Sequence, residues 1–426
     1  MTDGTATAHL YRPKLLSILA EGYGLARLKR DVPAALTVAI VALPLSMAFA
    51  IASGVSPERG LYTAIVGGFL VSALGGSRFQ IGGPAGAFIV LVAATVARFG
   101  IQGLLVTVLM SGIFLTLLGL SRLGSLIRHI PHAVTVGFSA GIAVIILASQ
   151  LKELGGLSLR GAEPGAFLPK LIALGRALPT LNPAALGIGI AVAALIFAQR
   201  RWRPNWPGML LAVIAASIMA ALAHLPVETI AGRFGALPHS LPVPALPHMD
   251  GPLLLALLPT ALSFTLLGGV ESLLSAKVAD SMTGRKHRAN MELVAQGIAN
   301  IASAIFGGMP VTGTIARTAT NVRAGATSPL SGMLHAVFLM LFLLVAAPLA
   351  GYVPLAALAG VLVVVCWNMA DRAEFAALLR KWPAALVLAA TFVLTIVRDL
   401  TFGIIAGCVL AAIFALLHRP VREEGA

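Results

Sequence analysis

The chain has 426 residues, of which 58% are hydrophobic and 11% charged, and its mean hydropathy is +0.94. This composition excludes an ordinary soluble globular protein and indicates an integral membrane protein. The formal net charge of +14 suggests nucleic acid as a partner, but membrane topology also gathers Lys and Arg in the loops of one side. The two cysteines, Cys366 and Cys408, lie in apolar runs without metal-ligand spacing, so we predict neither a disulfide framework nor a metal site.

Residues 1–32 are polar and basic, and the first apolar run begins only after Asp31 and is too long for a signal peptide. We expect this segment to stay in the cytoplasm. Seven apolar segments follow, near residues 33–53, 61–75, 81–97, 103–120, 132–150, 183–199 and 206–224. After a Pro-rich stretch, seven more lie near residues 253–276, 292–306, 310–322, 328–349, 355–370, 383–397 and 400–418.

Two sets of seven apolar segments indicate a duplicated chain. Most segments match the roughly 20 residues that cross a bilayer, and an odd number of spans inverts the second copy. We therefore predict an all-α polytopic membrane protein with 14 transmembrane segments in a 7+7 inverted repeat. The repeats are 33–224 and 253–418, the connection 225–252 is extracellular, and the tail 419–426 is cytoplasmic. This topology places most Lys and Arg residues in cytoplasmic loops, which explains the net charge without nucleic acid.

The third segment of each set is broken. Gly82–Phe88 reads GGPAGAF and Gly307–Arg323 reads GGMPVTGTIARTATNVR, so each places Gly-Gly and a proline before a helix-forming run. This pattern predicts an extended strand leading into a half-helix that begins inside the membrane. If the free N–H groups and positive dipole ends of the two half-helices face each other, they form an anion site.

We predict that the substrate-binding residues lie at these two breaks. Arg317 would lie about 6 Å along the second half-helix, and an arginine inside a membrane is costly enough to suggest a function. The alternative to a functional role for Arg317 is a structural one, in which backbone carbonyls or a carboxylate cap its side chain. For Phe88 the alternative to a substrate contact is ordinary core packing. The predicted binding residues are Pro84, Ala85, Gly86, Ala87, Phe88, Thr312, Gly313, Thr314, Ile315, Ala316 and Arg317.

Glu271 is the only carboxylate in the apolar run Gly251–Ala276, and Ser275 lies one helical turn further on. A carboxyl group held in the membrane is expensive when charged, so we predict that Glu271 carries a coupling proton beside the anion site, with Ser275 on the same face. The alternative is a Glu at the cytoplasmic edge that pairs with a loop base such as Lys277.

One enzyme-like motif occurs in the chain. Gly137–Gly141 matches G-x-S-x-G around Ser139, which would suit an intramembrane hydrolase, but the motif sits inside an apolar span. A Gly-xxx-Gly helix-packing face explains it better. No nucleotide or metalloprotease motif occurs, so we predict a protein that is not an enzyme, needs no cofactor and uses ion gradients.

The segment 31–64, DVPAALTVAIVALPLSMAFAIASGVSPERGLYTA, resembles the first-span signature of the sulfate permease (SulP) anion transporters, which include the prestin-like proteins. The resemblance continues through GGPAGAF, through ESLLSAKVADSMTGRKHRANMELVAQGIANI at 271–301 and through GGMPVTGTIARTATN at 307–321. It implies a mobile core domain, a gate domain, elevator-like alternating access and a homodimer in the cell membrane.

Two departures from the family pattern stand out. Pro44 is followed by Leu45 where a glutamine is usual, so one polar substrate contact is absent. The family's C-terminal regulatory (STAS) domain is also absent before Ala426, so either the chain is truncated or its regulation differs.

The function we predict is proton-coupled symport of a small carboxylate, dicarboxylate or inorganic oxyanion. The resemblance leaves sodium-coupled bicarbonate uptake, with Glu271 as a sodium ligand, and uncoupled anion exchange or conductance as alternatives. A voltage-driven motor, like some members of the family, is a further alternative. The expected partners are therefore the anion, a proton or sodium ion, the lipid bilayer and a second copy of the chain.

Overall fold

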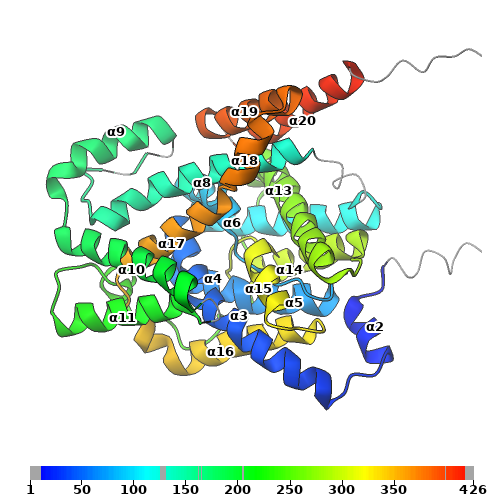
Figure 1. The fold of residues 1–426 in the computed structure, drawn as a ribbon, viewed down its shortest axis with the longest axis horizontal. Coiled ribbons are helices and arrows are strands. Elements are labelled where there is room, and N and C mark those ends of the chain that lie inside the picture. The colour runs from blue at the N-terminus through cyan, green and yellow to red at the C-terminus, as the bar shows by residue number, and fades with distance from the viewer. Residues whose placement is uncertain are drawn as a thin grey trace, which may run out of the picture.

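The computed structural model describes residues 11–124, 131–161, 163–164, 166–203, 206–398 and 400–417. The predicted tail 419–426 and residues 1–10 of the N-terminal segment lie outside the described residues. Figure 1 shows a bundle made almost entirely of helices, as predicted.

The first half of the chain contains a helix in each predicted apolar segment. The first long helix begins at Leu25 rather than near residue 33 and continues through Pro33 and Pro44. The predicted third and fourth segments are two helices that meet at a kink at Gly100, which has the non-helical angles φ 68° and ψ −172°, and both are included in α6. The elements are α2 (Lys14–Ala20), α3 (Leu25–Ala52), α4 (Pro57–Tyr62), the π turn η2 (Thr63–Gly67), α5 (Gly68–Leu74), β1 (Gly82–Gly83), the 3-10 turn η3 (Gly86–Phe88), α6 (Ile89–Leu120), α8 (His132–Gly155), α9 (Phe167–Ala177), η4 (Leu178–Thr180), α10 (Pro183–Trp202) and α11 (Gly208–Leu222).

The second half repeats this order, with a strand and a short helix in the same relative place. Asp250 caps the first long helix of this half by accepting a hydrogen bond from the N–H of Leu253 (2.9 Å). The short helices α2, α9, α12 and α18 were not predicted, because they are too short or too polar to stand out in hydropathy. The elements are α12 (Ile230–Phe234), α13 (Gly251–Thr283), α14 (Ala289–Ile305), β2 (Thr312–Gly313), α15 (Ile315–Arg323), α16 (Leu330–Ala350), α17 (Leu355–Met369), α18 (Arg372–Leu379), α19 (Trp382–Val397) and α20 (Leu400–Leu417).

Among the described residues, 7 helices are long and apolar enough to cross a membrane by themselves, and shorter apolar helices lie at Gly208–Leu222, Trp382–Val397 and Phe402–Phe414. The remaining predicted spans are broken or divided between elements. The α4–η2–α5 segment changes helix type, for example, and α15 has only 9 residues. Length and hydropathy of single helices therefore understate the number of apolar segments in this fold.

The helices pack into two groups, and each group draws on both halves of the chain (Figure 1). In the core group, α6 packs against α13 and α14, while α16 packs against α3 and α5. In the gate group, α8 packs against α17 and α19, α10 against α17, and α19 against α20. Helix α11 joins the gate group through α10 and also touches α3. These groups correspond to the core and gate domains that the family resemblance implies.

Candidate functional site

The two breaks meet as a pair of antiparallel strands inside the core group. Gly82 pairs with Gly313 and Gly83 with Thr312. A side chain at Gly313 has no room, because its Cβ would collide with the buried side chain of Gln80. The prediction that the two breaks lie close together therefore agrees with the structure.

Side chains of α14 hold the extended segment before β2. The Asn300 amide donates to the carbonyl of Val311 (2.8 Å) and accepts from its N–H (2.9 Å), so it imitates a neighbouring strand. Ser303 donates to the carbonyl of Met309 (2.6 Å), and the N–H of Met309 donates to Thr63 (2.6 Å). These bonds satisfy backbone groups that would otherwise be buried without partners, which is what allows an unwound segment inside a membrane.

Hydroxyl groups on α13 support β2 from the other side. Ser272 and Thr312 share a hydrogen bond (2.9 Å), and Ser272 also accepts from the N–H of Gly313 (3.2 Å). Ser275 donates to Thr318 on α15 (3.0 Å), and Thr314 donates to the carbonyl of Ile81 (3.2 Å). The hydroxyl groups of Ser275 and Thr314 are thus both donated within the protein.

The start of α15 is open. Thr314 is its N-cap residue but makes no side-chain capping bond, so the first-turn N–H groups of the helix have no cap. Ile315 is 42% exposed and Ala316 is also exposed, in contrast with the buried residues on either side. This exposed helix N-terminus offers free donors and the positive end of a dipole.

Arg317 lies just inside this helix and is 1% exposed. Its Nη2 donates to Ser46 Oγ (3.3 Å) and to the carbonyl of Pro84 (3.3 Å), which links α15 to α3 and to the first break. Its Nη1 is buried without a hydrogen-bond partner, and within the described residues no carboxylate lies at salt-bridge distance. One arm therefore behaves as the structural alternative expects, while the other arm has no hydrogen-bond partner among the described residues.

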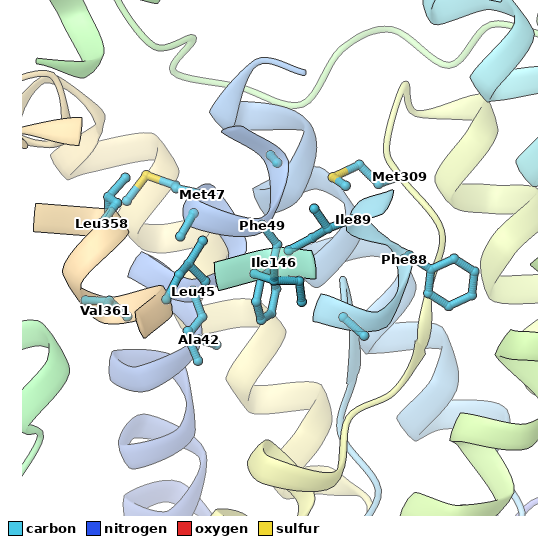
Figure 2. Packing of buried hydrophobic residues seen from close by; sticks show 14 of the residues in the cluster. Ala42, Leu45, Met47, Phe49, Phe88, Ile89, Ile146, Met309, Leu358 and Val361 are labelled. Atoms are coloured by element: carbon cyan, nitrogen blue, oxygen red, sulfur yellow. The ribbon is translucent and has the colours of Figure 1, made fainter. Parts of the chain in front are cut away.

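The first break is packed more tightly than the second. Figure 2 shows Phe49 and Ile146 together beside the break, while Phe88 points away from them. Phe88 is 2% exposed and meets Phe264 edge to face at 5.4 Å, which supports core packing for this side chain. A methyl group added to Gly86 would lie 3.4 Å from the side chains of Phe49, Ile146 and Met369. Pro84, Ala85 and Ala87 are buried as well.

Glu271 lies on α13, partly buried, and its Oε2 is buried with no hydrogen-bond partner among the residues that the structure describes. Lys277 is exposed, and within the described part of the chain no ion pair joins it to Glu271. The alternative of a paired cytoplasmic-edge Glu is therefore not what this structure contains. Ser275 bonds to Thr318 on α15 rather than to Glu271, so its contact is with the second half-helix.

Several polar residues of the site were not singled out from the sequence. Ser46 binds Arg317, and Ser272, Thr318 and Asn300 hold the two strands. The sequence feature that could have identified these residues is a polar side chain inside an apolar span, which marks functional positions in membrane proteins. His335 on α16 follows the same rule, since it is fully buried and neither ring nitrogen has a partner within the described ranges.

Asp31 was used only to mark the start of the first span, yet it is fully buried and heavily bonded. It accepts hydrogen bonds from Tyr23 (2.9 Å), from Ser328 (2.5 Å) and from both the N–H and the hydroxyl of Thr327 (2.6 and 3.0 Å). Asp31 thereby fastens the start of α3 to the turn that follows α15.

The G-x-S-x-G motif packs helices. A Cβ on Gly137 would lie 2.6 Å from the carbonyl oxygen of Leu388, and one on Gly141 would lie 2.9 Å from Thr395. The glycines thus let α8 approach α19 closely, as the helix-packing interpretation of Ser139 predicts.

The structure is a polytopic all-α bundle in which two unwound segments cross in the interior, and an open helix end lies beside a buried arginine. These features are typical of membrane transporters with discontinuous helices. The chain belongs to the sulfate permease family, whose model matches residues 28–413. It is therefore an anion transporter and not an enzyme.

Relatives with curated descriptions agree with this assignment. The chain is 44% identical over 398 residues to the Bacillus subtilis protein named "Putative sulfate transporter YvdB". The aligned region covers 92% of this chain and 74% of that protein. It is 32% identical to "Bicarbonate transporter BicA" of Synechocystis sp., over 94% of this chain and 72% of that protein.

Solved structures show the same fold. The transmembrane domain of a cyanobacterial bicarbonate transporter BicA superposes with a TM-score of 0.78 at 30% identity and covers 91% of this chain and 98% of that chain. The structure of SLC26A9 superposes with a TM-score of 0.88 at 18% identity and covers 98% of this chain and 70% of that chain.

Proposed function

We propose that this protein is a secondary active transporter that moves a small anion together with a proton, by elevator-like movement of the core group against the gate group. The observation that carries the proposal is the unpartnered Nη1 of Arg317 beside the uncapped start of α15. A buried guanidinium without a carboxylate is expensive, and a bound anion would supply the missing partner.

The substrate we propose is a small oxyanion or carboxylate. One arginine arm and the backbone N–H groups of a helix start provide positive potential and few directional contacts, which suits a compact anion. Leu45, which is 4% exposed, adds no polar contact. The relatives are named as sulfate and bicarbonate transporters, so these two anions are the first to test.

The coupling residue we propose is Glu271. It lies on α13, the helix that carries Ser272 and Ser275, both of which touch the strand pair or the second half-helix. Protonation of a carboxyl group at that place would offset the charge of the anion on the moving group. Its buried Oε2 has no partner, which leaves it available to a proton or a cation.

A second candidate function is sodium-coupled bicarbonate uptake. It is favoured by the 32% identity to a protein named as a bicarbonate transporter. In this alternative Glu271 would bind sodium instead of a proton. Uncoupled anion exchange or conductance is the third candidate. For all three we propose that both ends lie in the cytoplasm, on the basis of the Lys and Arg distribution. We also propose a homodimer in the cell membrane, on the basis of the family resemblance alone.

The experiment is uptake into liposomes that contain the purified protein, with labelled sulfate, bicarbonate or dicarboxylate outside. Proton and sodium gradients are imposed separately and together. Proton symport predicts uptake above equilibrium with an inward proton gradient alone. Accumulation that requires an inward sodium gradient would replace the proton by sodium, and exchange without accumulation would support the uncoupled alternative.

A further inference from the structure

An apolar groove lies between the core group and the gate group. Its volume is about 560 Å³. The floor is one face of α3 from Leu36 to Met47, one wall is α11 around Ile214 and Ile218, and the other wall is α16 around Phe338 and Phe342. Helix α3 packs firmly against α16 and more lightly against α11, so the groove follows the line where the two groups part.

The lining cannot bind the transported anion. It contains no charged residue and no amide side chain. Its hydroxyl on α11, Ser217, donates to the carbonyl of Val213 in its own helix (2.8 Å) and is therefore satisfied. A second hydroxyl, that of Tyr352, stands at the end of the groove near the turn after α16. The groove is thus distinct in chemistry from the polar site around Arg317.

The groove opens toward the membrane. Leu36, Ile214 and Ile218 on its rim are 46%, 44% and 54% exposed, and all three lie in apolar helices. In a membrane protein these exposed side chains meet hydrocarbon rather than water. The environment that can fill the groove is therefore the bilayer itself.

We propose that the groove binds one acyl chain of a membrane lipid. From Leu36 to Met47 the helix rises roughly 16 Å, which is about half of a 30 Å hydrocarbon core and so fits one leaflet. Tyr352 is 63% exposed at the end of the groove, where a tyrosine normally marks the interface with the headgroups. The lipid therefore belongs to the leaflet on the side of the α16–α17 turn.

The occupant that we propose is an acyl chain, because the lining is apolar and the rim residues Leu36, Ile214 and Ile218 face the hydrocarbon of the bilayer. An acyl chain is narrow enough to lie along α3 between the two walls. Because the walls belong to different helix groups, a bound chain contacts both groups at once.

The test is photolabelling, which measures binding without transport and so stands apart from the proposed function. The protein is placed in phosphatidylethanolamine–phosphatidylglycerol vesicles with a trace of phosphatidylcholine that carries a diazirine in mid-chain. We expect labels to concentrate on the α3 segment 36–47 and the α11 segment 210–221. In a parallel sample a diazirine fatty acid replaces the phospholipid probe, which separates free fatty acid from phospholipid as the source of the chain.

Ser217→Phe and Ala221→Phe fill the groove from the α11 wall, where both side chains have room at the surface. Each should lower labelling of the α3 segment at least fivefold. The matched control is Ala215→Phe, an exposed position of the same helix that does not line the groove, and it should leave labelling unchanged. Equal α3 labelling in the control and in both groove variants, or even labelling of all lipid-facing helices, would overturn the proposal.

Discussion

Replacing Arg317 by glutamine removes the one buried positive charge beside the open helix start. A charge about 4 Å from a bound anion contributes about 4 kcal/mol at an effective dielectric constant near 20. Since 1.4 kcal/mol corresponds to a factor of ten, the dissociation constant for the anion should rise about 100- to 1000-fold. Arg317→Lys should recover part of this loss, because a point charge remains but the planar fork does not.

The fold should tolerate the same change. No carboxylate in the described part of the chain pairs with Arg317, so its removal leaves no opposite charge of those residues stranded in the interior. The variant loses two hydrogen bonds of 3.3 Å, to Ser46 and Pro84, which are worth about 1 kcal/mol each. The free energy of unfolding should therefore fall by no more than about 2 kcal/mol, and this loss is partly offset because a buried charge is removed.

Titration calorimetry of sulfate and bicarbonate with the purified protein measures the effect, and thermal unfolding checks the fold. The matched control is Arg323→Gln in the last turn of the same helix, where the side chain is exposed. It should leave anion affinity within about twofold, because an exposed charge is screened by solvent. A folded Arg317→Gln protein with unchanged affinity would refute an electrostatic role for Arg317.

Three further predictions concern stability. Asn300→Ala should lower the free energy of unfolding by about 3 kcal/mol, because it leaves the buried N–H and carbonyl of Val311 without their partner. A denaturation midpoint equal to that of the parent would contradict this. Gly313→Ala should cost about 1–3 kcal/mol through its collision with Gln80, and Gln80→Ala in the same chain should restore part of it in the same assay. In the loop after α11 the hydrogen bond from Arg233 lowers the pKa of Glu228 below its usual 4.5, so Glu228→Gln should cost at most about 1 kcal/mol at neutral pH. This cost should begin to shrink as the pH falls past 4.5 and should vanish once the pH lies below the lowered pKa of the folded state. An equal cost at neutral pH and in strong acid would exclude the ion pair as its source.

The helix content and the order of the apolar segments could be predicted from the sequence because the bilayer forces each span to be apolar over its whole length. The two breaks were visible for the same reason, since Gly-Gly, proline and threonine are conspicuous there. What hydropathy could not locate is the start of α3 at Leu25, where basic residues form a helix before the apolar run. Nor does hydropathy find a short amphipathic helix such as α9.

The site was only partly predictable. The sequence indicated Arg317 and Glu271 because a charge in an apolar run is expensive. It did not indicate that Ser46 binds Arg317, or that the Asn300 side chain stands in for a strand, because one polar residue in a span does not specify its partner. The hydroxyl of Thr314 was expected to bind the anion, but in the structure it is donated to a backbone carbonyl.

Proton-driven uptake by Glu271→Gln in liposomes shows directly whether this carboxyl group couples anion movement to protons. Glutamine imitates the protonated carboxyl group but cannot release a proton. The account predicts that this variant still binds anion and still exchanges it, while an inward proton gradient no longer accelerates net uptake. Uptake by the variant that rises with the proton gradient as steeply as in the parent would contradict Glu271 as the coupling residue.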